Sequence, residues 1–199
     1  MEGERDITLR AALAGYFADN GFGADGGYGD AWVDFSLGPL PFPFPNTEGR
    51  KRAVRFHDLH HLVTGYPTDT VGELTISAWE IGAGCGDFYA AWVINLSGMG
   101  LGALVAPSRV FRAFVRGRGS RTFYGEVYEE VLEERVADAR AARVRDRAPT
   151  LGDRALFAAG AAVGCAVATV FAAAALPLLP LGLFNLWRKR RATTPAGVL

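Results

Sequence analysis

Apolar positions along most of the chain recur at helical spacing, and no stretch alternates between apolar and polar residues over a sustained length. This pattern predicts an all-α domain without a sheet over residues 7–147. A glycine-rich stretch at 20–29 predicts a loop, and alternating prolines at 39–45 predict an extended segment. Residues 28–35 are predicted to resume as a helix, because two aromatic side chains lie three apart on one helical face.

The second half of the domain contains three further helical patterns. Residues 88–106 carry no charge and are long enough to span a bilayer, although glycines and Asn95 weaken the run as a membrane helix. The arginines at 109, 112 and 116 recur at helical spacing, which suits a membrane surface or, equally, the solvated outer face of a globular helix. Residues 124–147 predict one long, charged amphipathic helix.

The C-terminal part differs in composition from everything before it. Residues 155–187 contain no charged side chain and are mostly Ala, Leu, Val and Phe, and a basic cluster follows at 188–191. The segment is long enough to cross a bilayer before two prolines bend it, so it forms either one tilted spanning helix or a shallow hairpin. In both cases the basic cluster favours a cytoplasmic C-terminus.

These patterns divide the chain into a helical domain at 1–150 and a hydrophobic membrane segment at 151–199. Deleting the chain from Arg154 onward is expected to release the domain from the membrane or leave it loosely attached. Gly160 and Gly164 form a G-x-x-x-G step, which suits the packing of two such helices in a homodimer, although an alanine-rich run also produces this spacing by chance.

Composition narrows the cellular context. The chain has 21 basic and 21 acidic residues, and this balance argues against nucleic acid as a partner. Its two cysteines lie far apart, which argues against a disulfide framework and indicates a reducing compartment. Residues 1–6 are acidic and have the features of neither a signal peptide nor a transit peptide, so we expect a bacterial protein that faces the cytoplasm.

All three histidines of the chain lie within residues 57–61, and this concentration predicts a metal site. On a helix, His57, Asp58 and His61 crowd one face within a turn. A glycine and a proline then end the helix and reverse the chain, so that a second helix brings Glu73 back toward the first. We therefore predict that His57, Asp58, His61 and Glu73 bind one divalent metal and perform the chemistry, with His60 outside the ligand set.

Imidazole nitrogen and carboxylate oxygen without thiolate suit zinc, iron(II) or manganese. Two alternatives remain at this stage. Glu73 stands three residues after Thr70 and fits a capping box at the start of its own helix. His60 is expected to point away from the other two histidines, as a surface or partner-facing residue.

The motif His-Asp-x-x-His, followed after eleven residues by Glu, resembles the signature of the coenzyme Q biosynthesis protein 4 family. Similar flanking pieces extend the resemblance over residues 10–142. The resemblance implies a helical, membrane-associated protein of ubiquinone biosynthesis, whose motif binds a metal and which acts on the carboxylated ring of a polyprenylated hydroxybenzoate. It also places residues 88–106 inside the domain as a buried helix. The hydrophobic C-terminal segment departs from the family pattern.

Two functions remain open from the sequence. In the first, the protein is an enzyme in which zinc or iron orients the aromatic acid while the ring loses carboxylate and gains a hydroxyl. In the second, the protein is a non-catalytic scaffold that binds the prenyl lipid and presents it to other quinone-biosynthesis proteins. Both place the protein at the bacterial inner membrane, with the domain on the cytoplasmic face.

Overall fold

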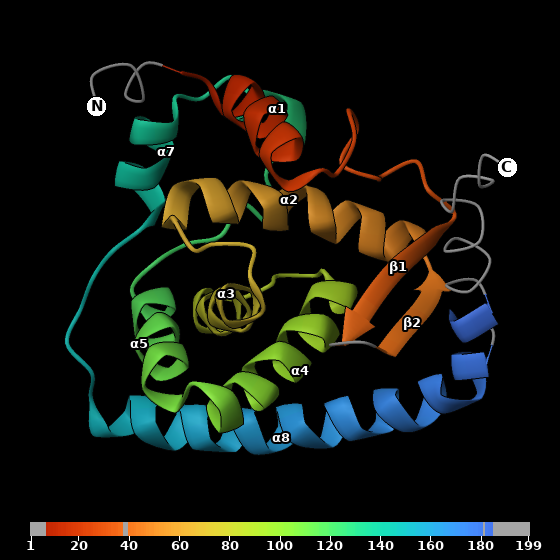
Figure 1. Cartoon of the computed structure of the whole chain (residues 1–199). Coiled ribbons are helices and arrows are strands. Elements are labelled where there is room, and N and C mark those ends of the chain that lie inside the picture. The colour runs from red at the N-terminus through yellow and green to blue at the C-terminus, as the bar shows by residue number, and fades with distance from the viewer. Residues whose placement is uncertain (1–6, 38–39, 181, 185–199) are drawn as a thin grey trace, which may run out of the picture.

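The computed structural model describes residues 7–37, 40–180 and 182–184 and is mostly helical, which confirms the main part of the all-α prediction (Figure 1). In chain order, its elements are α1 (Leu9–Asn20), β1 (Trp32–Leu37), β2 (Leu40–Pro45), α2 (Glu48–Thr64), α3 (Thr70–Ala83), α4 (Tyr89–Val105), α5 (Pro107–Arg118), α6 (Tyr128–Val131), α7 (Val136–Arg143), α8 (Leu151–Ala175) and the 3-10 turn η2 (Leu176–Leu178).

The prediction of no sheet is wrong at one place, where β1 and β2 form an antiparallel hairpin. The ladder runs from Trp32 opposite Pro45 to Leu37 opposite Leu40. Residues 28–35 therefore do not resume as a helix. Aromatic and β-branched residues in β1 favour an extended chain, and a two-stranded ribbon tolerates the prolines of β2 because each strand has a free edge.

The long helix predicted over 124–147 is also wrong, because the structure has only the short helices α6 and α7 there. The segment between α6 and α7 instead accepts hydrogen bonds from the start of α1. The backbone N–H of Leu9 donates to the carbonyl of Glu134 at 2.8 Å, and that of Arg10 donates to Leu132 at 2.9 Å. These carbonyls satisfy donors in the first turn of α1, which have no partner within their own helix.

Helix α3 lies at the centre of the fold, with α2, α4 and α5 around it (Figure 1). The buried face of α3 includes Trp79, which is fully buried. Glycines allow α3 and α5 to approach with their backbones: a Cβ on Gly82 would lie 2.3 Å from the carbonyl oxygen of Phe114, and one on Gly117 would lie 2.1 Å from that of Trp79.

The connection from α2 to α3 is a compact reversal, as the sequence predicts. Gly65 ends α2 with a φ of 74°, in the left-handed region that favours glycine. The Asp69 side chain accepts from the N–H of Gly72 at 2.7 Å and caps the start of α3. Asp69 thus has the capping role, so Glu73 is free to face α2. Arg116 and Arg140 donate to carbonyls in the last turn of α2 and hold this end in place.

Helix α8 runs along the bottom of the molecule and packs against α4 (Figure 1). Gly164 makes the closest approach, since a Cβ there would lie 2.0 Å from the carbonyl oxygen of Leu96. The G-x-x-x-G step therefore contacts α4 of the same chain. The stretch Leu151–Ala174 is long and apolar enough to cross a membrane, by length and composition, and little of it is buried in the molecule. The predicted basic cluster at 188–191 lies outside the described residues.

Candidate metal centre

The structure brings three of the four predicted ligands together between α2 and α3. His57 and His61 lie one turn apart on α2, and their Nε2 atoms are 3.2 Å from each other. Glu73, in the first turn of α3, completes the triangle: its Oε2 lies 3.2 Å from His57 Nε2, and its Oε1 lies 3.3 Å from His61 Nε2. These three side chains form a group that can hold a metal ion.

The other ring nitrogen of each histidine has a partner that fixes its protonation. His61 Nδ1 lies 2.8 Å from the carbonyl oxygen of Tyr66, which can only accept, so Nδ1 carries the proton. His57 Nδ1 lies 2.8 Å from Glu80 Oε1 and donates in the same way. In the neutral form of each ring, Nε2 therefore presents a lone pair to the space shared with Glu73, as it does in metal-ligating histidines.

The distances also fit a metal ion in size. Ligands at about 2.0–2.1 Å from a tetrahedral zinc or similar ion are about 3.3 Å from one another. The separation of 3.2 Å between the two Nε2 atoms matches one edge of such a polyhedron, and each of these nitrogens lies within 3.3 Å of a different oxygen of Glu73. A set of two imidazoles and one carboxylate accepts zinc, iron(II) or manganese alike. The geometry thus suits a divalent ion and leaves its identity open among zinc, iron(II) and manganese.

Asp58 is the predicted ligand that the structure does not bring into this set. Its carboxylate is buried, and Oδ2 accepts from the hydroxyl of Tyr28 at 2.5 Å. Burial raises the pKa of Asp58, an effect that the nearby His57 and the Tyr28 hydrogen bond oppose. In this arrangement Asp58 lies outside the ligand set and anchors the loop before β1.

Glu80 is a component of the site that the sequence does not single out. It is fully buried, and both oxygens accept two hydrogen bonds each. Oε1 accepts from His57 Nδ1 and His60 Nδ1, both at 2.8 Å, and Oε2 accepts from Asn95 Nδ2 and from the Tyr124 hydroxyl. Glu80 is thereby a carboxylate that orients a ligand histidine from behind. Its spacing of seven residues from Glu73, two helical turns, is the signal that points to it.

His60 is not the surface residue that the sequence predicts, because its side chain is fully buried. Its Nε2 accepts from the backbone N–H of Phe123 at 2.9 Å, so its Nδ1 must carry the proton that Glu80 accepts. The ring also stacks on Phe123, with centroids 5.4 Å apart. His60 is held neutral, since burial lowers its pKa more than Glu80 raises it. Both nitrogens are occupied, which leaves His60 outside the ligand set.

The charge states of His57 and Glu73 depend on each other. Burial disfavours the charged form of His57, but the carboxylates of Glu80 and Glu73 outweigh it and raise the His57 pKa well above its usual value. Burial also acts against ionised Glu73, yet the adjacent rings of His57 and His61 lower its pKa to about 2. Glu73 is therefore ionised at neutral pH. The centre attracts a positive charge, either a proton on His57 or a metal ion.

The centre is open on the side of Glu73. The Glu73 side chain is 43% exposed and that of His57 is 18% exposed, whereas that of His61 is 1% exposed. A metal with three protein ligands and a solvent-facing side retains positions for water or substrate, which is typical of catalytic sites.

Comparison with protein-family models, with curated proteins and with solved structures found no match for this chain. Fold and site together define a helical protein with a candidate His-His-Glu metal centre and an apolar helix able to cross a membrane.

Proposed function

We propose that the chain is a metal-dependent enzyme of ubiquinone biosynthesis, which oxidatively decarboxylates a polyprenylated hydroxybenzoate. The observation that carries the proposal is the convergence of His57, His61 and Glu73 with both Nε2 lone pairs directed inward and one side open. The substrate class rests on the resemblance of the histidine motif and its flanks to the coenzyme Q biosynthesis protein 4 family. The centre alone supports metal chemistry on a small polar group.

A divalent metal bound here supplies Lewis acidity and, if it is iron, redox activity for oxygen activation. Replacing a ring carboxylate by a hydroxyl releases carbon dioxide and inserts one oxygen atom. If dioxygen supplies that atom, an external two-electron donor must reduce the other oxygen atom to water, and this redox step favours iron over zinc in an enzyme. The protein residues have separate tasks in this proposal. His57, His61 and Glu73 would hold the metal, Glu80 keeps His57 in the required tautomer, and the exposed edge of Glu73 borders the space for the aromatic acid.

The proposal also places the protein at the bacterial inner membrane, with the helical domain on the cytoplasmic face and other quinone-biosynthesis proteins as partners. It is supported by α8, whose apolar surface is mostly exposed in the isolated chain. Exposed apolar side chains on α4, among them Leu101, Leu104 and Val105, enlarge the same face. A polyprenyl substrate resides in the bilayer, so an enzyme that acts on it benefits from this contact.

A second candidate function is a non-catalytic scaffold that binds the prenyl lipid, with a structural metal. The extent of exposed apolar surface on α4 and α8 favours it, because lipid binding needs such a surface whether or not catalysis follows.

Single alanine substitutions at His57, His61 and Glu73 distinguish the two candidates, with Glu130→Ala, an exposed glutamate of α6, as the control. Metal content is measured on the purified full-length chain, and quinone production is measured in a bacterial host that depends on it. Loss of both metal and quinone, with helix content unchanged, supports the enzyme. Loss of metal with continued quinone synthesis supports the scaffold, and stoichiometric metal in His57→Ala contradicts the centre itself.

A further inference from the structure

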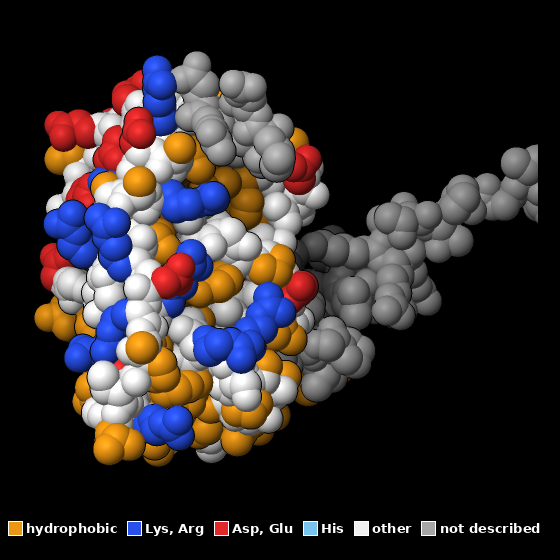
Figure 2. Space-filling view, turned by 90° about the vertical axis from the view of Figure 1, so that its left-hand side faces the viewer, with side chains coloured by type: hydrophobic (Ala, Val, Ile, Leu, Met, Phe, Trp, Pro, Cys, Tyr) orange, Lys and Arg blue, Asp and Glu red, His pale blue; other side chains and the backbone are white. Residues whose placement is uncertain are grey.

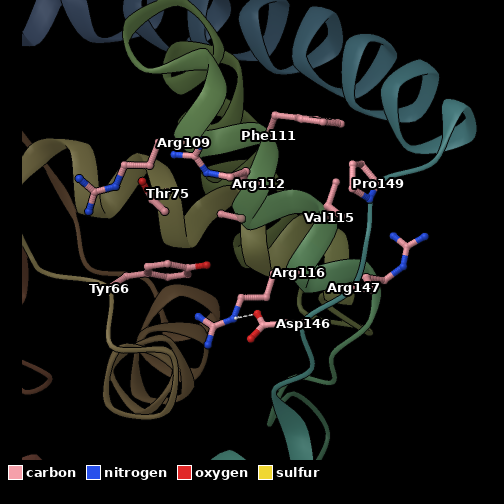
Figure 3. Close-up of a pocket in the computed structure, with 11 residues that line it drawn as sticks. Tyr66, Thr75, Arg109, Phe111, Arg112, Val115, Arg116, Asp146, Arg147 and Pro149 are labelled. Atoms are coloured by element: carbon pink, nitrogen blue, oxygen red, sulfur yellow. Dashed lines mark ion pairs between the residues drawn. The ribbon is translucent and has the colours of Figure 1, made fainter.

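A second candidate site lies on the other side of the α2–α3 connection, in a groove of about 340 Å³. One side of the groove is α5, and the opposite sides are Tyr66, Thr75 and the segment 146–149 that leads to α8 (Figure 3). Four arginines line it, namely Arg109, Arg112 and Arg116 of α5 together with Arg147.

The four arginines differ in whether their guanidinium groups already have an ion-pair partner. Arg116 pairs with Asp146 at 2.9 Å, and Arg147 pairs with Asp153 at 2.9 Å. Arg109 and Arg112 have no hydrogen-bond or ion-pair partner within the part of the chain that the structure describes. With a single carboxylate lining it, the groove carries excess positive charge. Two unpaired guanidinium groups about one turn apart on the same helix can both donate to the oxygens of one phosphate group.

The groove adjoins the apolar face formed by α4 and α8. Phe111 lines the groove, and its ring centroid lies 5.3 Å from that of Phe157 on α8. The last turn of α4, immediately before α5, exposes Leu104 at 73%, and the first residue of α8, Leu151, is 83% exposed. Figure 2 shows basic side chains on this face of the molecule, with hydrophobic side chains below them where α8 lies. Basic groups at the edge of an apolar face are positioned at the depth of lipid headgroups.

We propose that this groove binds the phosphate of an anionic phospholipid from the bilayer, with Arg109 and Arg112 as its direct ligands. The proposal rests on the membrane location in the proposed function, but not on the metal centre or its chemistry. The apolar part of the groove, including Phe111 and Pro149, contacts the lipid next to its headgroup. Each arginine near an anionic bilayer surface contributes about fivefold in affinity, and the pair about 25-fold.

The test uses the full-length chain in neutral detergent, titrated with dioleoyl phosphatidic acid and, separately, with dioleoyl phosphatidylcholine, with bound lipids counted by native mass spectrometry. The variant Arg109→Gln/Arg112→Gln removes both unpaired arginines. The control Arg52→Gln/Arg121→Gln removes the same charge from exposed arginines outside the groove. Circular dichroism verifies that all three proteins keep their helix content.

We expect one phosphatidic acid to bind the native chain and the control about 25-fold more tightly than it binds the groove variant, and phosphatidylcholine to bind all three alike. Equal binding of phosphatidic acid by the groove variant overturns the proposal. Displacement of the lipid by equimolar inorganic phosphate also overturns it, because the groove then takes free phosphate. Co-sedimentation with neutral vesicles tests the membrane location separately, and its failure leaves the lipid titration interpretable.

Discussion

A buried carboxylate is unfavourable unless donors surround it, and Glu80 accepts four hydrogen bonds with none of its side chain exposed. In Glu80→Gln, the amide oxygen can still accept from His57 and His60 if Asn95 and Tyr124 turn to accept from the amide nitrogen. The charge that strengthens the bond to His57 is nevertheless lost. We expect metal affinity to fall about 10–100-fold, and stability to fall by about 1–3 kcal/mol.

Chelator competition measures the metal affinity of this variant, and thermal unfolding of the metal-free protein measures its stability. Glu130→Gln is the matched control, because Glu130 is exposed and its side chain has no partner in the described structure. Unchanged metal affinity in Glu80→Gln would show that Glu80 stabilises only the fold.

Both the stability of the metal-free protein and its metal affinity are expected to depend on pH through His57. Burial lowers the pKa of His57, but Glu80 and Glu73 outweigh it and raise that pKa well above the usual histidine value. In the metal-free protein this raised pKa contributes stability that is fully present below about pH 6.5, the unfolded value, and is lost as pH rises through the folded pKa. Metal affinity depends on pH in the opposite direction and rises with pH, because the proton and the metal compete for Nε2 of His57. Glu73, with a pKa of about 2, adds no dependence in this range.

We therefore expect metal affinity to rise with pH until His57 is deprotonated, while the melting temperature of the metal-free protein falls over the same interval. Isothermal titration with Zn²⁺ and thermal unfolding, both from pH 6 to 9, measure the two trends. A flat affinity across this interval would mean that His57 is not a ligand.

At the scale of elements, three glycines of α8 predict graded effects of alanine substitution on its packing against α4. An added Cβ would lie 2.0 Å from a backbone oxygen at Gly164, 2.7 Å from the flexible end of Met99 at Gly160, and 3.7 Å from its nearest neighbour at Gly152. We expect Gly164→Ala to weaken the packing by about 1–3 kcal/mol, Gly160→Ala to weaken it less, and Gly152→Ala to be neutral.

The free thiol of Cys165 reports this packing, since its backbone adjoins Gly100 of α4 and its side chain is half-buried. Maleimide labelling should accelerate most in Gly164→Ala. Equal labelling rates in all three variants would indicate that α8 separates from α4 in solution.

The elements that the sequence predicts well are those whose signals are local. The reversal between α2 and α3 follows from Gly65 and Pro67, and the same signals predict the approach of Glu73 to the histidines. The hairpin and the break between α6 and α7 depend on distant partners. Residues 132–134 form no helix because the carbonyls of Leu132 and Glu134 accept hydrogen bonds from α1, more than 120 positions earlier in the chain.

The candidate site shows the same division between local and distant signals. The triad of His57, His61 and Glu73 is visible in the spacing of the sequence. Asp58, which shares that spacing, is held by Tyr28 from the loop before β1, and sequence periodicity carries no information about such a contact. Glu80 could be found by its two-turn spacing from Glu73, but its partners Asn95 and Tyr124 come from elements that only the fold brings close.

At the scale of the whole molecule, α8 has two surfaces with different tasks. Its inner surface covers α4, where Met99 is fully buried beneath Gly160, and contacts α5 through Phe157. Its outer surface is apolar and exposed. The sequence alone predicts that deletion of this segment releases the domain. The structure changes that expectation, because the deletion uncovers apolar side chains of α4 and α5 that α8 buries.

We therefore expect a chain that ends at Thr150 to be lost from the integral membrane fraction yet to aggregate unless detergent is present. Newly exposed Met99 and Phe114 would join the already exposed Leu101 and Leu104 in one apolar patch, which is typical of aggregation or membrane contact. Carbonate extraction followed by gel filtration measures both effects, and a chain that ends at Phe184 is the control because it keeps α8. Recovery of the shorter chain as a detergent-free monomer would show that α4 is stable without this cover, so that α8 serves the membrane alone.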